Sequence, residues 1–450
     1  MSNKNNQINA VGRETFNNKL GFILACVGSA VGMGNIWLFP TRVSLYGGGT
    51  FILPYIFFVV VIGYSGLIGE MGLGRSTRNG PIGAFAKAMG SKGKSENMGR
   101  LFGFIPTIGS LLLAIGYTVV ISWILKYTVG VFTGSIFTPT SMEEFGAAFG
   151  GMASSFGNTT WVIITILLSF FIMNAGVAKG IEKLNKFMMP LFFVLFIVLA
   201  IYISTLPGAA DGYRYIFTFD PKGLLDPIVW IYALGQAFFS LSLGGSGTVT
   251  YGSYLKDDED ILYSAKIVAI FDSAAALLAA LVIIPAMATT GSQLSEGGPG
   301  LLFIHLPNLF KNMPGGRIVA IIFFVAVTFA SMTSIVNLYE TSIAALQDEF
   351  KFSRTKSTLT IGALGLISSL LIQGIVGEWM DVVSIYINPI GAVIAAIMFY
   401  WVFGTNYTKN ELQKGRSIQI GGWFEPMTKY VFVFVTILVY ISGVLLGGIG

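Results

Sequence analysis

The sequence of 450 residues contains a single cysteine, Cys26, and a single histidine, His305. One cysteine cannot form a disulfide within the chain, and one histidine removes most metal sites and histidine-based catalytic arrangements. Charged residues make up 11% of the chain, against about 25% in an average soluble protein. No G-x-x-x-x-G-K-[ST] run is present to bind nucleotide phosphates. These absences argue against a soluble protein, an enzyme and an ATP-driven pump.

Apolar residues are correspondingly frequent: they make up 54% of the chain, and the mean hydropathy is +0.74. A helix needs about 20 mostly apolar residues to cross a bilayer. We therefore predict an all-α membrane protein with eleven transmembrane helices. The predicted spans are residues 18–43, 50–75, 101–130, 158–177, 183–206, 227–254, 261–288, 316–348, 358–375, 380–403 and 426–448.

Positive charge predicts which way these spans face. Lys and Arg gather in alternate connections, at residues 13–19, 75–100, 179–186, 351–356 and 409–416. Because such residues stay in the cytoplasm, the N-terminus is predicted to be cytoplasmic, and an odd number of spans puts the C-terminus outside. The first ten residues are polar, so we expect no cleavable signal and a multi-pass protein of the cell membrane. The net charge of +5 is interpreted as topological, with no nucleic-acid partner.

Two glycine-rich breaks interrupt the first and sixth spans, at residues 29–35 (SAVGMGN) and 240–247 (SLSLGGSG). A helix that unwinds in a bilayer frees N–H and C=O groups that lipid cannot bind, so the break must face protein, water, an ion or a solute. Broken helices at matching positions in two halves indicate a transporter's binding site. Two groups of five spans insert with opposite topology, which predicts an inverted repeat with divisions 1–206, 207–404 and 405–450.

The first break offers ligands for an ion and for a carboxylate. Amides at a helix start suit a carboxylate, and those available are on Met33 and Gly34. Asn35 adds an uncharged side-chain oxygen. A plain glycine kink for close helix packing is the alternative for this break alone. The carbonyl groups that suit a hard cation such as Na+ are those of Gly28, Ala30 and Val31.

The second break and later spans add further oxygens. The break carries the carbonyls of Phe239 and Ser240 and the hydroxyls of Ser240 and Ser242, and span eight carries Ser331, Thr333 and Ser334. Such hydroxyls more often bond their own helix backbone, which is the alternative here.

Two carboxylates lie deep in the predicted spans. Asp272 lies in the middle of span seven with no basic residue nearby in the span, so its expected partner is a cation or a proton. Glu70 in span two is expected to bind the freed amides of the first break, and a charge near the membrane surface is the alternative.

Residues 32–40 (GMGNIWLFP) and 47–51 (GGGTF) resemble the start of the neurotransmitter:sodium symporters, as does the stretch 235–244 (GQAFFSLSLG). The resemblance runs from about Arg13 to the last span. A single appended span is similar to the eleven-span bacterial branch of amino-acid transporters. The resemblance implies the same fold, in which helices one and six are broken and five spans repeat inverted.

The resemblance also implies a role for individual residues. One sodium site would use the Ala30 carbonyl with Asn35, Ser240 and Asp272. A second would use the carbonyls of Gly28, Val31 and Ala330 with the hydroxyls of Thr333 and Ser334. The substrate site would be formed by Ala30, Met33, Gly34, Leu113, Tyr117, Phe239, Ser240, Ser242, Gly245, Ser334 and Leu338.

Gates are implied on both sides of that site. The inner gate would pair Arg13 with Asp348, next to Phe16, and Tyr254 would cap the pair. In the outer gate the family commonly carries an Arg where Leu38 stands, paired with an acid that matches Asp381. Arg42 is a candidate replacement for that Arg.

The predicted function is sodium-coupled import of hydrophobic L-amino acids, including aromatic ones, by alternating access. Asp272 is expected to supply the negative charge that chloride provides elsewhere, so transport should not need chloride. Gly245 is expected to enlarge the pocket. The alternatives are a cation channel or another solute:cation symporter, and no TVGYG-like filter loop supports the channel.

Overall fold

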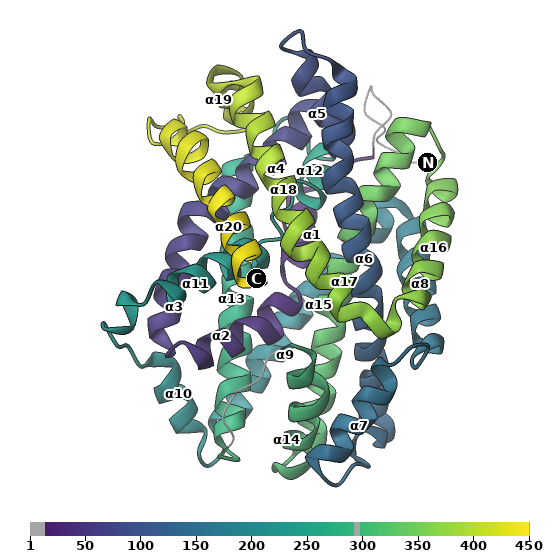
Figure 1. The fold of residues 1–450 in the computed structure, drawn as a ribbon, viewed down its shortest axis with the longest axis vertical. Coiled ribbons are helices and arrows are strands. Elements are labelled where there is room, and N and C mark those ends of the chain that lie inside the picture. The colour runs from purple at the N-terminus through teal and green to yellow at the C-terminus, as the bar shows by residue number, and fades with distance from the viewer. Residues whose placement is uncertain (1–13, 292–297, 450) are drawn as a thin grey trace, which may run out of the picture.

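The computed structural model describes residues 14–291 and 298–449, and these residues form helices and loops without a β-strand (Figure 1). The predicted all-α class is confirmed. The first five spans correspond to α1 (Lys19–Ala30) with η1 (Gly34–Leu38) and α2 (Phe39–Leu45); α3 (Gly49–Phe58), η2 (Val59–Gly63) and α4 (Tyr64–Thr77); α6 (Glu96–Thr133); α8 (Thr159–Asn174); and η4 (Val177–Ile181) with α9 (Glu182–Ser204).

The helices of the second half are likewise matched to the predicted spans in chain order. Its spans correspond to α11 (Pro227–Ser240) with α12 (Gly247–Ser253); α13 (Ile261–Ala288); α15 (Gly316–Phe350); α16 (Arg354–Leu371); and a chain of η7 (Gln373–Ile375), α17 (Val376–Asp381), η8 (Val382–Ile387), α18 (Asn388–Ala396) and η9 (Ile397–Phe403). The last span is η10 (Pro426–Phe432) with α20 (Val433–Leu446).

Short helices that the sequence did not predict connect the spans. They are α5 (Pro81–Gly90), η3 (Ser135–Phe137), α7 (Met142–Ala153), α10 (Ala209–Phe217), η5 (Gly223–Leu225), η6 (Leu301–His305), α14 (Leu306–Asn312) and α19 (Thr405–Gln413).

Seven helices of the described chain are long and apolar enough to cross a membrane, and the bent pair of α1 and η1–α2 makes an eighth. This pair bends by 56° at its break. The helices α8 and α11, of 16 and 14 residues, are too short for that test, and α16, of 18 residues, is not among the helices that pass it. The number of eleven spans therefore stays a prediction, although each predicted span has a helix.

Backbone conformation explains where the second broken helix stops. Ser242 has φ 53° and Gly245 has φ 68°, both in the left-handed region that a right-handed helix cannot contain. The first helix ends differently, because Val31 after α1 is extended, with ψ 109°. In both broken helices, backbone dihedral angles outside the helical range interrupt the helix.

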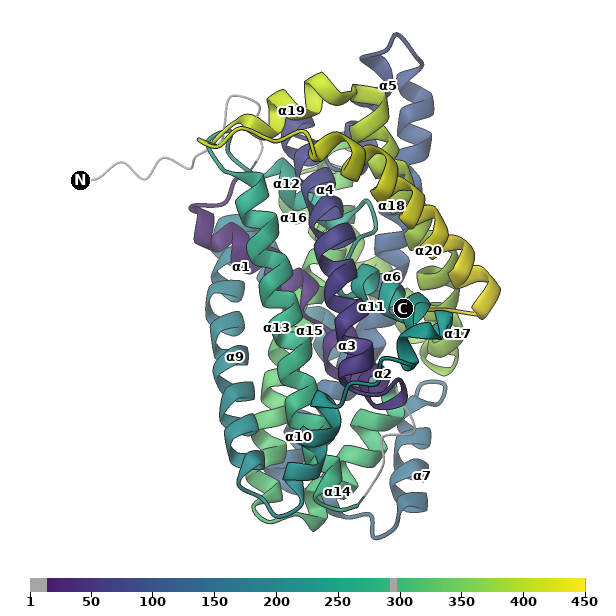
Figure 2. The ribbon, with the colours of Figure 1, turned by 90° about the vertical axis from the view of Figure 1, so that its left-hand side faces the viewer.

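The packing of the helices places both breaks at the centre of the bundle. The long helices α6 and α15 pack against each other, and α13 packs against α1, η1, α2, α4 and α9. In Figure 2, α9, α13 and α4 stand side by side, and α20 lies on the outside against α18. Most residues of both breaks are accordingly buried.

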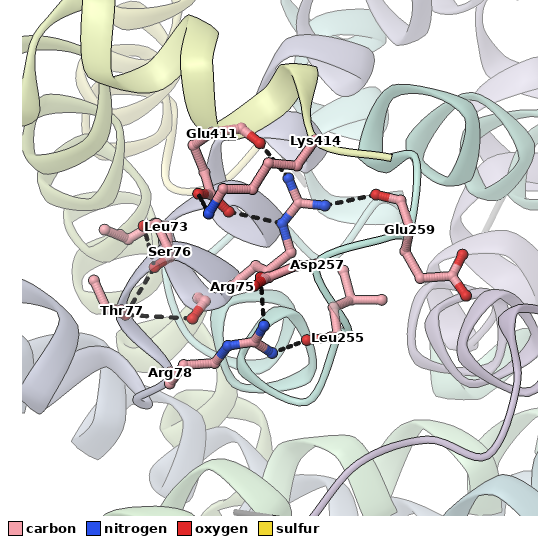
Figure 3. A network of polar contacts seen from close by, with 11 residues as sticks. Leu73, Arg75, Ser76, Thr77, Arg78, Leu255, Asp257, Glu259, Glu411 and Lys414 are labelled. Atoms are coloured by element: carbon pink, nitrogen blue, oxygen red, sulfur yellow. Dashed lines mark hydrogen bonds and ion pairs between the residues drawn. The ribbon is translucent and has the colours of Figure 1, made fainter. Parts of the chain in front are cut away.

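A polar network at one end of α4 anchors the short half-helix α12 (Figure 3). Arg75 donates from Nε to Glu411 Oε1 at 2.7 Å and from Nη1 to the Glu259 carbonyl at 2.6 Å. Arg78 donates to Asp257 Oδ1 at 2.5 Å and to the Leu255 carbonyl. The network joins α4 to the loop that follows α12 and to α19, so the base of the second broken helix is held from two sides.

Candidate binding site at the two helix breaks

The two breaks face each other and are joined by direct hydrogen bonds. The Ser242 hydroxyl donates to the Ser29 carbonyl at 3.0 Å, and Gln236 Nε2 donates to the Gly34 carbonyl at 3.0 Å. The opposite helix thus supplies a donor to each of these carbonyls, of which that of Gly34 also accepts the Phe39 N–H.

Glu70 completes this arrangement at the second break. Its Oε1 atom accepts the N–H groups of Gly244 at 3.0 Å and of Gly245 at 2.8 Å. The expectation that Glu70 binds the amides of the first break is therefore wrong. The reason is that α4 packs along α12, so the carboxylate on α4 meets the backbone that leads into α12.

Oxygen cluster one, defined here as Asn35, Ser240 and Asp272, contains a fully buried carboxylate. Asp272 Oδ1 lies 2.8 Å from Asn35 Nδ2, and Asp272 Oδ2 accepts the Ser240 hydroxyl at 2.6 Å. Asn35 Nδ2 also lies 3.0 Å from Ser240 Oγ. The three residues come from η1, α11 and α13, and the sequence predicted their association.

Oxygen cluster two, defined here as Gly28, Val31, Ala330, Thr333 and Ser334, joins α1 to α15. Ser334 Oγ lies 3.1, 2.9 and 3.0 Å from the carbonyl oxygens of Gly28, Val31 and Ala330. Thr333 Oγ1 lies 2.9 Å from that same Ala330 oxygen. Three carbonyls and two hydroxyls therefore converge, and none of these five groups carries a formal charge.

Neither cluster has the donor set of a transition-metal site. In the described residues no three His, Cys, Asp or Glu side chains come together. Neutral oxygens with at most one carboxylate suit a hard, weakly charged cation. The predicted sodium ligands are thus brought together in two groups, and their role as ligands stays a prediction.

A cavity of about 150 Å3 lies between the breaks and the α6–α15 pair. Predicted site residues that line it are Ala30, Met33, Gly34, Leu113, Tyr117, Phe239, Ser240, Ser242, Ser334 and Leu338. None of the residues that line it carries a charge. The N–H groups of Met33 and Gly34 precede the first backbone bonds of the outer half-helix, which run from Asn35 and Ile36 to Gly32.

The sequence missed part of this lining. Trp37 and Asn337 line the cavity, and so do Met380, Ser384 and Asn388 of the tenth span. Asn337 follows Ser334 by three residues, so helical spacing places both on one face of α15. The residues of the tenth span were missed because the only charge in that span, Asp381, was assigned to the outer gate, and Ser384 and Asn388 are single polar residues in an apolar run.

Gly245 does not line the cavity, which corrects the expectation that it enlarges the pocket. Its φ is 68°, and a β-carbon added to it would overlap the carbonyl oxygen of Gly391. The neighbouring Gly244 does line the cavity, and a β-carbon there would meet only Ser246 Oγ, at 3.6 Å. The glycine that leaves space for a ligand is therefore Gly244, one residue earlier.

The predicted inner gate lies at the base of α12. Phe16 packs edge-to-face against Tyr254, with ring centroids 6.2 Å apart. Asp348 Oδ2 accepts the Gly80 N–H at 3.1 Å. Arg13 lies outside the described residues, so its pairing with Asp348, and the capping of that pair by Tyr254, stay predictions.

Glu340 is a buried residue of this gate that the sequence analysis missed. Its carboxylate accepts the Tyr254 hydroxyl at 2.6 Å and both Nη atoms of Arg354 at 2.6 and 2.7 Å. A carboxylate inside predicted span eight, residues 316–348, followed 14 residues later by an Arg, was the available signal. The pair fixes α15 to the start of α16.

At the outer end, Arg42 does not pair with Asp381. The Arg42 guanidinium lies over the Tyr232 ring, 3.8 Å from its centroid. Among the described side chains no ion pair joins Arg42 to Asp381. Asp381 lies at the end of α17, next to the Met380 side of the cavity. Arg42 therefore makes a cation–π contact with Tyr232 and not the outer ion pair with Asp381 that the sequence suggested.

Comparison with known proteins gives a consistent result. The sodium:neurotransmitter symporter family matches residues 13–140 and 138–446. A sodium-dependent transporter of Methanocaldococcus jannaschii is 31% identical over 97% of this chain and 92% of its own. The sodium-dependent transporter YhdH of Bacillus subtilis is 36% identical over 77% of this chain and 75% of its own.

A solved structure is similar over nearly the whole fold. The crystal structure of MhsT in complex with L-phenylalanine matches with a TM-score of 0.82 and 32% identity, over 96% of this chain and 100% of that one.

Proposed function

Because this chain belongs to the sodium:neurotransmitter symporter family, we propose that it imports hydrophobic amino acids, including aromatic ones, together with Na+. One observation carries the proposal: a cavity of about 150 Å3 without a charged lining residue lies at two unwound helices. A cavity of about that volume admits a benzene ring. Leu113, Phe239 and Leu338 keep its walls apolar, and no basic or acidic group is present to pair with a charged side chain.

The backbone of the breaks supplies the contacts for the amino-acid head group. The substrate carboxylate binds the N–H groups of Met33 and Gly34 and the hydroxyl of Tyr117, which lies beside Gly32. The ammonium binds carbonyls of the two breaks, which carry the negative ends of peptide dipoles. These are the carbonyls of Ala30, Phe239 and Ser240, together with the Ser242 hydroxyl.

Two sodium ions accompany the substrate in this proposal. Oxygen cluster one, with the Ala30 carbonyl, binds the ion next to the substrate carboxylate, so substrate and ion favour each other's binding. Oxygen cluster two binds the other. The buried Asp272 charge compensates the ions without chloride, and a further anion would be repelled.

Alternating access follows from where the gates lie. Tyr117 and Phe239 close the cavity on the outer side, and Phe16, Tyr254 and Asp348 close the side that we assign to the cytoplasm. The positive connections of the sequence support this orientation, with the N-terminus inside and the C-terminus outside.

Uptake into proteoliposomes tests the proposal. An inward sodium gradient should accumulate labelled L-phenylalanine, an equal potassium gradient should not, and unlabelled apolar amino acids should compete. Competition by Asp, Glu, Lys or Arg equal to that by Leu would contradict the assigned substrate class. Sodium current without solute accumulation would instead indicate a channel.

A further inference from the structure

Asn185 of α9 is a fully buried amide that neither the sequence analysis nor the proposed sodium sites use. Its Nδ2 atom donates to the Ile181 carbonyl at 2.8 Å, one helical turn earlier. Its Oδ1 atom has no hydrogen-bond partner among the described residues. A buried acceptor without a partner loses its hydration without compensation, so such atoms call for an explanation.

The Asn185 oxygen lies next to Gly28 and Thr333, two residues of oxygen cluster two. A β-carbon added to Gly28 would overlap Asn185 Oδ1, and it would also lie 2.8 Å from Thr333 Cβ and 3.1 Å from Thr333 Oγ1. The Asn185 oxygen and the Thr333 hydroxyl thus approach the same face of Gly28, whose carbonyl belongs to the cluster. Helix α9 packs against both α1 and α15, the two helices that the cluster joins.

The bond to Ile181 fixes the direction of this side chain. With Nδ2 held by its own helix, the amide presents its oxygen, the negative end of its dipole, to the cluster. Amide oxygens are ligands that hard cations accept, and those cations commonly take six or more oxygens. Cluster two alone supplies five: three carbonyls and two hydroxyls.

We propose that Asn185 Oδ1 is a further oxygen of oxygen cluster two, and that this residue sets the affinity of the cluster for sodium. The inference rests on the proposed sodium coupling. It also explains why residue 28 is a glycine, because the carboxamide occupies the space that a β-carbon would need.

The test compares two fully or nearly fully buried asparagines of the same chain. Asn158 also donates from Nδ2, to Ser122 Oγ at 2.8 Å. Within residues 14–291 and 298–449 its Oδ1 atom is also without a hydrogen-bond partner, and no hydrogen bond joins Asn158 to cluster two. Asn185→Leu removes the oxygen at similar volume, Asn185→Asp retains one, and Asn158→Leu is the matched control. Asn185→Ala replaces the first variant if Leu prevents folding.

The readout is the thermal midpoint of the purified full chain, measured without amino acid against rising NaCl, with KCl added to keep ionic strength constant. We expect Asn185→Leu to raise the half-saturating sodium concentration about tenfold or more, the size of one lost contact to a charged group. Asn185→Asp should stay near the wild-type value or below it, and Asn158→Leu should match the wild type.

Each outcome separates this inference from the proposed function. An unchanged sodium response in Asn185→Leu, or an equal change in Asn158→Leu, overturns the role of Asn185 and leaves the transporter proposal standing. A wild type that sodium stabilises no more than potassium overturns the sodium coupling and this inference together. A sodium response without amino-acid binding overturns only the substrate assignment.

Discussion

Oxygen clusters one and two lie at the same broken helix but are built from different chemistry. Cluster one holds a carboxylate, and side-chain hydrogen bonds of 2.6–3.0 Å cross-link its three residues. Cluster two holds only neutral oxygens, three of them from the backbone. A cation in cluster one is therefore attracted by charge, whereas a cation in cluster two depends on how many oxygens reach it.

The helices that each cluster joins differ as well. Cluster one connects η1, α11 and α13, and the bonds among its side chains hold these elements together without a cation. Cluster two connects α1 to α15, and its geometry is lost if one helix shifts against the other. The two clusters therefore differ in what joins their helices: bonds among three side chains in cluster one, and one hydroxyl, that of Ser334, with the carbonyls of Gly28 and Val31 in cluster two.

The largest effect is expected from removing both hydroxyls of cluster two. Thr333→Ala combined with Ser334→Ala takes away two of its five oxygens, and a neutral site has no charge to compensate the loss. Sodium affinity should fall about 100-fold or more, since each contact to a charged group contributes about 1.5–3 kcal/mol. The measurement is sodium-dependent binding of labelled L-phenylalanine.

Ser331→Ala is the control for that double variant. Ser331 lies on the same helix and is buried, but its hydroxyl donates to the Thr328 carbonyl at 3.0 Å, away from the cluster. Its sodium response should equal that of the wild type. If the double variant also keeps its sodium affinity, cluster two binds no sodium.

A smaller loss is expected from Asp272→Asn in cluster one. The amide keeps one oxygen for the cation, but the charge is gone and one of the two acceptor positions becomes a donor. Sodium affinity should fall about 10–100-fold, as for one charged contact. Ser273→Ala, next in the chain, should leave the sodium titration unchanged, and an unchanged titration in Asp272→Asn would remove the carboxylate from the site.

The sequence predicted features that depend on length and composition along the chain. The helix breaks were predictable because glycine and serine interrupt long apolar runs, and Asp272 because a lone carboxylate in such a run requires a partner. Glu70 was assigned to the wrong break, since its position in the sequence gives its depth in the membrane but does not say which neighbour it faces.

The errors and omissions arise from packing. The sequence alone does not distinguish Gly244 from Gly245. Only the positive φ of Gly245 and its contact with Gly391 show that Gly245 shapes the backbone, whereas Gly244 lines the cavity. Asn185 stands between charged residues in the stretch Lys183–Lys186, which is typical of a surface, and it is buried because α1 and α15 cover it. No pattern along one chain segment contains that information.

Substrates of different size test the different roles of Gly244 and Gly245, and we expect a change in binding of moderate size. Gly244→Leu should fill the cavity and weaken Trp and Phe binding about tenfold or more relative to Val, since apolar pockets discriminate by about 1–3 kcal/mol per methylene. Gly245→Ala should leave the order of substrates unchanged and lower stability, because its β-carbon meets the Gly391 carbonyl. Competition against labelled Leu gives the order. Equal losses for Trp and Val in Gly244→Leu would place the side-chain pocket elsewhere.

The last prediction is that uptake by the wild type does not change when chloride is replaced by gluconate at constant sodium. Asp272 supplies the negative charge of cluster one, and Ala276, one helical turn later on α13, offers no hydroxyl to an anion. The initial rate of phenylalanine uptake should therefore be the same in both salts. The same exchange with the potassium salts controls for osmotic and surface effects. A fall in sodium-driven uptake in gluconate would mean that the Asp272 charge does not compensate the sodium ions. Chloride would then have to bind with sodium, and the difference in charge between clusters one and two would not by itself explain how sodium binds.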